Sequence, residues 1–137
     1  MDLPDLKPGL TGVARRTVTL GDTAEALGSG DVPVFGTPAL IALMEQAAVA
    51  ALAGALPADM TSVGIFLKVH HMAATPPGMA VSAQATVTTV DGRTVTFEVT
   101  AADTVEQIGQ GVHRRILVDR ARFRQRAESK QDAPQPD

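Results

Sequence analysis

The chain of 137 residues contains no cysteine, tryptophan or tyrosine and only four phenylalanines. Without cysteine it can form neither disulfides nor thiolate metal sites. The net charge of -3 and the scarcity of aromatic side chains argue against nucleic acid as the main partner, because such binding needs a basic surface and stacking groups. The opening MDLPDLKPGL has neither the basic region nor the apolar core of a signal peptide, so we expect a cytoplasmic protein.

Long uninterrupted apolar runs are also absent. The longest apolar stretch, residues 38–56, is rich in alanine and contains Glu45, Gln46 and Gly54, so we expect no membrane segment. A chain of this length with 45% apolar residues can form one domain with a sizeable core. We therefore expect a single domain over residues 1–125, followed by a disordered polar tail over residues 126–137.

The apolar stretch itself predicts a long helix. Thr37 followed by Pro38 is typical of a helix start, with the Thr37 hydroxyl as N-cap. Gly54 and Pro57 supply the end, so the helix is predicted over residues 38–55. Because this helix is apolar on nearly every side, one sheet face cannot cover it, and a second copy of the chain is the simplest cover. The pattern predicts a homodimer.

The remaining sequence favours strands. Residues 11–20 are β-prone, residues 62–71 alternate between apolar and polar, and the Asp91-Gly92 pair between two alternating runs predicts a hairpin. Residues 106–118 give a further strand. One strand, a long helix and four more strands indicate an α+β fold in which the helix lies on an antiparallel sheet.

Glu45 is the first candidate functional residue, because an ionised carboxylate among apolar side chains is costly unless it is paired. A purely structural ion pair is the alternative. The alternation of residues 62–71 places His71 with Val69 on the face toward the core, and His70 with Lys68 on the solvent side. His71 is therefore the second candidate, although a hydrogen-bonded core histidine would give the same pattern.

Several signatures of chemistry are missing. The sequence has no His-Glu-x-x-His, no G-x-S-x-G, no P-loop and no dinucleotide-binding glycine motif, so neither a metal nor a nucleotide cofactor is predicted. His113 is interpreted as structural. Arginines crowd the last quarter of the chain, which indicates either a solvated charged helix or a patch for a small phosphorylated ligand; they are Arg114, Arg115, Arg120, Arg122, Arg124 and Arg126.

Three stretches, VFGTPALIALME, HHMAATPPG and VEQIGQGVHRR, resemble the hotdog-fold acyl-CoA thioesterases, most closely the fluoroacetyl-CoA thioesterases. The resemblance runs from residue 34 to residue 115. It implies a five-stranded antiparallel sheet wrapped around one long central helix, in a homodimer or a tetramer of such dimers. It also implies hydrolysis of a small acyl-CoA thioester to the free acid and CoA, without a cofactor. A non-catalytic acyl-CoA binding module and a hotdog-fold acyl-CoA hydratase are the alternatives.

The resemblance also implies roles for individual residues. Thr37, Glu45 and His71 match the catalytic residues of the family, Gly64 matches a backbone contact to the acyl group or its carbonyl, and Arg115 matches a residue that helps to bind the ligand. The two phenylalanines that form a lid in fluoroacetyl-CoA thioesterases match Gly28 and Asp31 here. A preference for fluoroacetyl-CoA is therefore not expected.

The spacing of two of these residues sets a geometric constraint. Thr37 and Glu45 are eight residues apart on the predicted helix, which separates them by about 12 Å along its axis. They cannot meet within one chain. If both serve one site, either the substrate spans this distance or one residue comes from the other subunit, and we expect the second arrangement.

Overall fold

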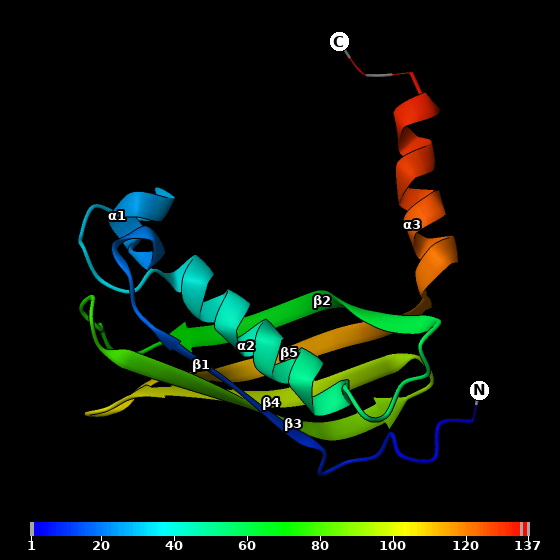
Figure 1. The fold of residues 1–137 in the computed structure, drawn as a ribbon, viewed down its shortest axis with the longest axis horizontal. Coiled ribbons are helices and arrows are strands. Elements are labelled where there is room, and N and C mark those ends of the chain that lie inside the picture. Colours follow the sequence, from blue (N-terminus) through cyan, green and yellow to red (C-terminus); the bar gives the residue numbers. More distant parts are fainter. Residues whose placement is uncertain (1, 135, 137) are drawn as a thin grey trace.

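The computed structural model describes residues 2–134 and residue 136, which form an antiparallel sheet with one long helix lying across it (Figure 1). The five strands are β1 Thr11–Thr17, β2 Met60–His71, β3 Ala80–Asp91, β4 Thr94–Asp103 and β5 Gln107–Asp119. Their order in the sheet is β1-β3-β4-β5-β2, and every neighbouring pair is antiparallel. The predicted α+β arrangement is confirmed.

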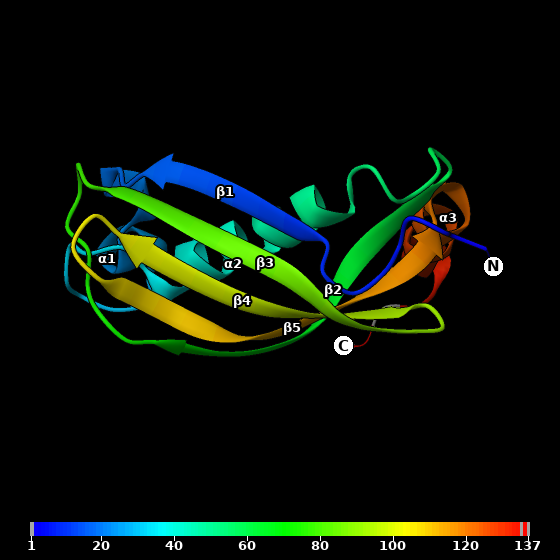
Figure 2. The same cartoon turned by 90° about the horizontal axis from the view of Figure 1, so that it is seen from below.

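The helical elements are few, and α2 is the longest of them. They are η1 Leu20–Asp22, α1 Ala24–Leu27, α2 Thr37–Leu52, α3 Arg120–Glu128 and η2 Ser129–Asp132. Figure 2, turned by 90°, shows the sheet curving beneath α2. The predicted hairpin joins β3 to β4 at Gly92, whose φ of 59° is a left-handed conformation that glycine adopts without strain.

Helix α2 begins differently from the prediction. Gly36 is the N-cap and Thr37 is the first helical residue, so the assignment of Thr37 as N-cap was wrong. The helix also ends at Leu52 rather than residue 55. Because the Thr37 hydroxyl makes no capping bond, it is available to another partner.

The core lies between α2 and the inner face of the sheet. The buried side of the helix consists of Leu40, Leu43, Met44, Ala47, Ala48, Ala51 and Leu52. Small residues let the helix approach β1 closely: a Cβ atom at Gly12 would overlap the backbone of Ala47 and Ala51. Gly12 therefore has no room for a side chain.

The free energy of unfolding tests this close approach. We expect Gly12→Ala to lower it by about 1–3 kcal/mol, since α2 must move away from β1 to admit the methyl group. Urea unfolding of Gly54→Ala is the matched control, because a Cβ there meets nothing within 4 Å. Equal stability of the two variants would contradict the packing.

The two margins of the fold remain open in one chain. Val49 on α2 is 50% exposed and Ile65 on the edge strand β2 is 51% exposed. The helix is thus covered on one side only, as its apolar composition predicts. Among the described residues, no helix combines the length and the apolar character needed to cross a membrane.

The C-terminal helix α3 projects away from the sheet (Figure 1). It continues to Glu128, and η2 follows to Asp132, so helical backbone extends into the segment predicted as a tail. Of that segment, Gln135 and Asp137 lie outside the described residues. The domain boundary at residue 125 stays a prediction.

Candidate active site

Thr37 and His71 form the first part of the site. Thr37 is the first residue of α2 and His71 the last residue of β2, and Thr37 Oγ1 lies 2.8 Å from His71 Nδ1. The pair opens onto a cavity of about 310 Å³. This cavity is lined by Ala24, Ser29, Val34, Phe35, Thr37, His71, Met72, Ala73 and Ala74.

The surroundings of His71 favour a neutral imidazole. Burial lowers the pKa of His71 below its usual value, and the nearby Ala73 backbone carbonyl offsets part of that effect. The Nε2 atom is buried and makes no hydrogen bond with the described residues. A neutral His71 protonated at Nε2 would accept the Thr37 proton at Nδ1, which is the geometry of an activated hydroxyl.

Backbone hydrogen bonds hold the segment that precedes Thr37. The Phe35 N–H donates to the Thr75 carbonyl at 2.8 Å, and the Gly36 N–H donates to the Asp22 carbonyl at 2.9 Å. These two bonds fix the two residues that immediately precede α2. The Thr37 hydroxyl is therefore placed by backbone that is itself anchored.

Glu45 forms the second part of the site, on the next turns of α2. Its Oε2 accepts a hydrogen bond from Arg115 Nη1 at 3.0 Å and lies 3.8 Å from His113 Nε2. The Glu45 side chain is 36% exposed, so the carboxylate still reaches solvent. A Cβ at Gly64 would collide with Oε2, so the carboxylate occupies space that only glycine leaves free.

A β-bulge explains how Gly64 comes to face the helix. Strict alternation along residues 62–71 would put Gly64 on the solvent face with Lys68 and His70, and the structure departs from that alternation at Gly64. The register with β5 shifts between Gly64 and Phe66, so that Gly64 and His71 both face α2. Lys68 and His70 are exposed on the opposite face, as predicted.

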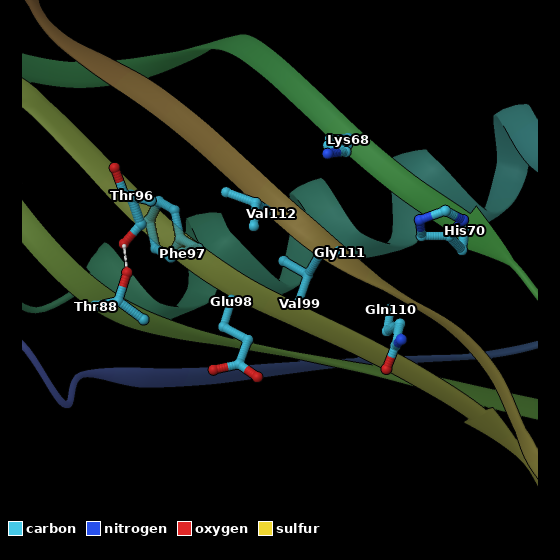
Figure 3. Close-up of a pocket in the computed structure, with 10 residues that line it drawn as sticks. All are labelled: Lys68, His70, Thr88, Thr96, Phe97, Glu98, Val99, Gln110, Gly111 and Val112. Atoms are coloured by element: carbon cyan, nitrogen blue, oxygen red, sulfur yellow. Dashed lines mark hydrogen bonds between the residues drawn. The ribbon is translucent and has the colours of Figure 1, made fainter.

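That opposite face carries a wider cavity of about 450 Å³ (Figure 3). Lys68 and His70 of β2, Glu98 of β4 and Gln110 of β5 line it, and all four are exposed. Its titratable side chains are exposed, whereas the smaller cavity contains the half-buried His71. Chemistry is therefore assigned to the side of the sheet that faces α2.

The structure brings the predicted residues together as two pairs. Thr37 contacts His71, and Glu45 contacts Arg115, but within one chain His71 does not contact Glu45. His113, interpreted as structural from the sequence, lies beside Glu45. The assignment of Thr37, Glu45 and His71 to a single catalytic site stays a prediction. The described residues contain no cluster of His, Asp or Glu side chains that could hold a metal.

The arginines near the C-terminus take several roles. Arg120 donates to the backbone carbonyls of Ala58 and Met60, and Arg124 pairs with Glu128 at 2.9 Å. Every residue of α3 is exposed. This arrangement favours the solvated charged helix over a dedicated ligand patch.

Comparisons with known proteins place the chain in a class. A hot-dog-like protein from Thermanaerovibrio acidaminovorans is 26% identical, with a TM-score of 0.84 over 95% of this chain and 97% of that chain. A point mutant of the fluoroacetyl-CoA-specific thioesterase FlK is 31% identical, with a TM-score of 0.83 over 93% of this chain and 98% of that chain. The fold is the hotdog fold, and the chain is a hotdog-fold thioesterase, as the resemblance implied.

The sequence assigns the family within that class. Residues 18–121 match the family described as fluoroacetyl-CoA-specific thioesterase. The fluoroacetyl-CoA thioesterase of Streptantibioticus cattleyicolor is 38% identical over 100 residues, which are 73% of this chain and 72% of that protein. The chain belongs to the fluoroacetyl-CoA-specific thioesterase family and is a thioester hydrolase.

The ionisation of His71 provides a direct test of the site. We expect His71 to titrate below the usual midpoint of about 6.5, because burial disfavours the imidazolium. The unfolded chain binds this proton more readily, so His71 also makes the free energy of unfolding fall as the pH drops below about 6.5. NMR titration of the imidazole resonances measures the midpoint. A His71 midpoint at or above about 6.5 would contradict the assigned surroundings.

Proposed function

We propose that the chain hydrolyses small acyl-CoA thioesters to the free acid and CoA, using Thr37, Glu45 and His71. The observation that supports this most is the Thr37–His71 hydrogen bond at the mouth of a cavity of about 310 Å³. A related structure, of a FlK mutant with fluoroacetate and CoA, is 32% identical with a TM-score of 0.81 over 86% of this chain and 99% of that chain. It supports CoA thioesters as the substrate class.

The chemistry divides among these groups. Attack on the thioester carbon by water, by the Thr37 hydroxyl or by the Glu45 carboxylate creates an oxyanion, after which the C–S bond breaks and the CoA sulfur takes up a proton. Attack by water gives the free acid directly, whereas attack by Thr37 or Glu45 leaves an acyl ester or anhydride that water then hydrolyses to the free acid. Glu45 acts as general base on water or as a nucleophile, and His71 carries protons to and from Thr37. The Gly64 N–H, at a bulge where strand pairing shifts, is the proposed donor to the oxyanion.

The proposed assembly is a homodimer that completes each site. β2 is an edge strand of 12 residues, and an exposed edge of this length is a ready partner for a second strand. Val49 on α2 and Ile65 on β2 are both apolar and half-exposed in one chain. A second copy docked along β2 would offer such side chains cover and bring its own Glu45 toward the Thr37–His71 pair.

Mixed dimers test whether the site is shared. Glu45→Ala and Thr37→Ala homodimers are each expected to be inactive. Random mixing of the two chains should restore about a quarter of wild-type activity, because about half of the dimers are mixed and each has one intact site. Thiol release from an acyl-CoA substrate is the readout. If the mixture stays as inactive as the separate variants, the shared arrangement is wrong.

Replacement of Glu45 alone tests its chemical role. We expect Glu45→Gln to lower kcat by roughly 10²- to 10⁴-fold, because the amide cannot accept the proton from water. The Gln46→Ala variant is the neighbouring control, since Gln46 is exposed and outside the site. Full activity of Glu45→Gln would contradict the assigned base.

The residues around the cavity entrance influence which acyl groups the enzyme accepts. Gly28 ends α1 in a left-handed conformation with φ 72°, and Asp31 is exposed in the loop that follows, so no aromatic side chain covers the cavity from these positions. The proposed substrates are small acyl groups without selection for fluorine.

A substrate panel tests this entrance. We expect kcat/KM values for acetyl-, propionyl- and fluoroacetyl-CoA to lie within about tenfold of one another, as one small group in an open pocket gives modest discrimination. A preference for fluoroacetyl-CoA of several hundredfold would show that another feature replaces the aromatic lid. Absence of hydrolysis with every acyl-CoA would contradict the proposed function itself.

A further inference from the structure

His113 is fully buried at the centre of the fold, and the proposed chemistry does not use it. Its side chain is 0% exposed, and its ring stacks on Phe97 with centroids 5.9 Å apart. Along β5, His113 and Arg115 both point toward α2 and lie beneath Glu45. A buried polar ring in this place needs a partner for each of its nitrogens.

The two partners of His113 define its protonation. Nδ1 lies 2.9 Å from the Phe66 carbonyl oxygen, which can only accept, so Nδ1 carries a proton. Nε2 lies 3.1 Å from Arg115 Nη1, which can only donate, so Nε2 must be an unprotonated acceptor. Both contacts are satisfied only by the neutral tautomer with hydrogen on Nδ1. Burial also lowers the pKa of His113, in the same direction.

Arg115 in turn is almost fully used within the protein. Its Nε donates to Ser62 Oγ at 2.8 Å and its Nη2 to the Ser62 carbonyl at 3.1 Å. Its Nη1 donates to Glu45 Oε2 and to His113 Nε2. Of the five N–H groups of a guanidinium, one is left for a ligand. This geometry favours a structural hold on Glu45 over the ligand binding that the resemblance implied for Arg115.

The result is an asymmetric carboxylate. Glu45 Oε2 is held by Arg115 beside Gly64, whereas Oε1 has no hydrogen bond to any described residue. Because the Glu45 side chain is partly exposed, Oε1 is the oxygen that can accept a proton from water or substrate. Rotation of the Arg115 guanidinium would release Glu45 Oε2, and the two carboxylate oxygens would no longer differ in their hydrogen bonding.

We propose that His113 is a positioning residue that fixes Arg115, through the Nε2 acceptor of its neutral Nδ1–H tautomer, so that Glu45 presents Oε1 to the substrate. The proposal rests on the proposed role of Glu45 as base or nucleophile. Protonation of His113 would point a donor at the Arg115 guanidinium and offer a competing partner to Glu45 Oε2 at 3.8 Å. The groups that face the ring are Glu45 from α2, Arg115 from β5, the Phe66 carbonyl from β2 and Phe97 from β4.

Two variants separate positioning from packing. His113→Phe keeps a ring against Phe97 and removes the acceptor, and we expect kcat to fall about 10- to 100-fold, the effect of one hydrogen bond to a charged group. KM should change less than threefold, since Arg115 and Glu45 still occupy the site. His113→Gln places an amide oxygen near the Nε2 position and should recover a large part of kcat. His70→Phe on the exposed outer face is the control and should keep wild-type activity.

The outcomes distinguish this proposal from the proposed function. Hydrolysis by the wild type tests the function alone, and wild-type kcat in an active His113→Phe variant overturns the positioning role. Equal losses of kcat in the Phe and Gln variants, in step with equal losses of stability, also overturn it. Nitrogen NMR of the His113 ring in the wild-type protein tests the proposed tautomer without any activity measurement, so it remains informative even if a variant fails to fold. An Nδ1–H tautomer that persists at pH 6 supports the proposal, and an Nε2–H or doubly protonated ring overturns it.

Discussion

The close packing of α2 on β1 is the constraint on which the site depends. Gly12 leaves no side chain between the strand and the helix backbone, and a Cβ there would overlap backbone atoms of Ala47 and Ala51. A helix seated this tightly cannot rotate or slide without creating overlaps or voids, since protein interiors are close-packed. Thr37 and Glu45 are thus held at fixed places on one rigid rod, about 12 Å apart along its axis. Thr37 and Glu45 of one chain therefore cannot both reach the same reacting atoms.

Different contacts hold Thr37 and Glu45 in place. At the Thr37 end, buried Thr75 accepts the Phe35 N–H with its carbonyl and donates its hydroxyl to Asp103 at 2.8 Å, which ties the turn before α2 to the end of β4. Backbone N–H groups of the loop after β4 lower the pKa of Asp103, so the acceptor for Thr75 stays ionised. At the Glu45 end the support is ionic, through Arg115. Arg115 Nη1 lies 3.0 Å from Glu45 Oε2, and the carboxylate keeps partial access to solvent.

The sequence correctly predicted the features that depend on hydrophobic periodicity and on turn-forming residues. The hairpin at Gly92, the long helix and the exposed position of His70 each follow from residues within a few positions of one another. What it missed depends on contacts distant in sequence. The bulge at Gly64 arises from register with β5, and nothing in residues 62–71 alone marks where it falls. Thr37 looked like an N-cap because local bonding is the default, yet its partner lies 34 residues away. The contacts of His113 with Glu45 and the Phe66 carbonyl could not be predicted either, because neither partner is near it in sequence.

The division of the site into two pairs has a physical consequence for catalysis. A nucleophile or base works only within hydrogen-bond reach of the group it serves, and neither pair by itself supplies a hydroxyl, an imidazole and a carboxylate. A flexible helix could bring the pairs together, but the packing at Gly12 opposes such motion. In the proposed homodimer, a second copy would bring its own Glu45 to the Thr37–His71 pair without motion of α2. The rigidity that separates Thr37 from Glu45 therefore favours the proposed shared site over a conformational change within one chain.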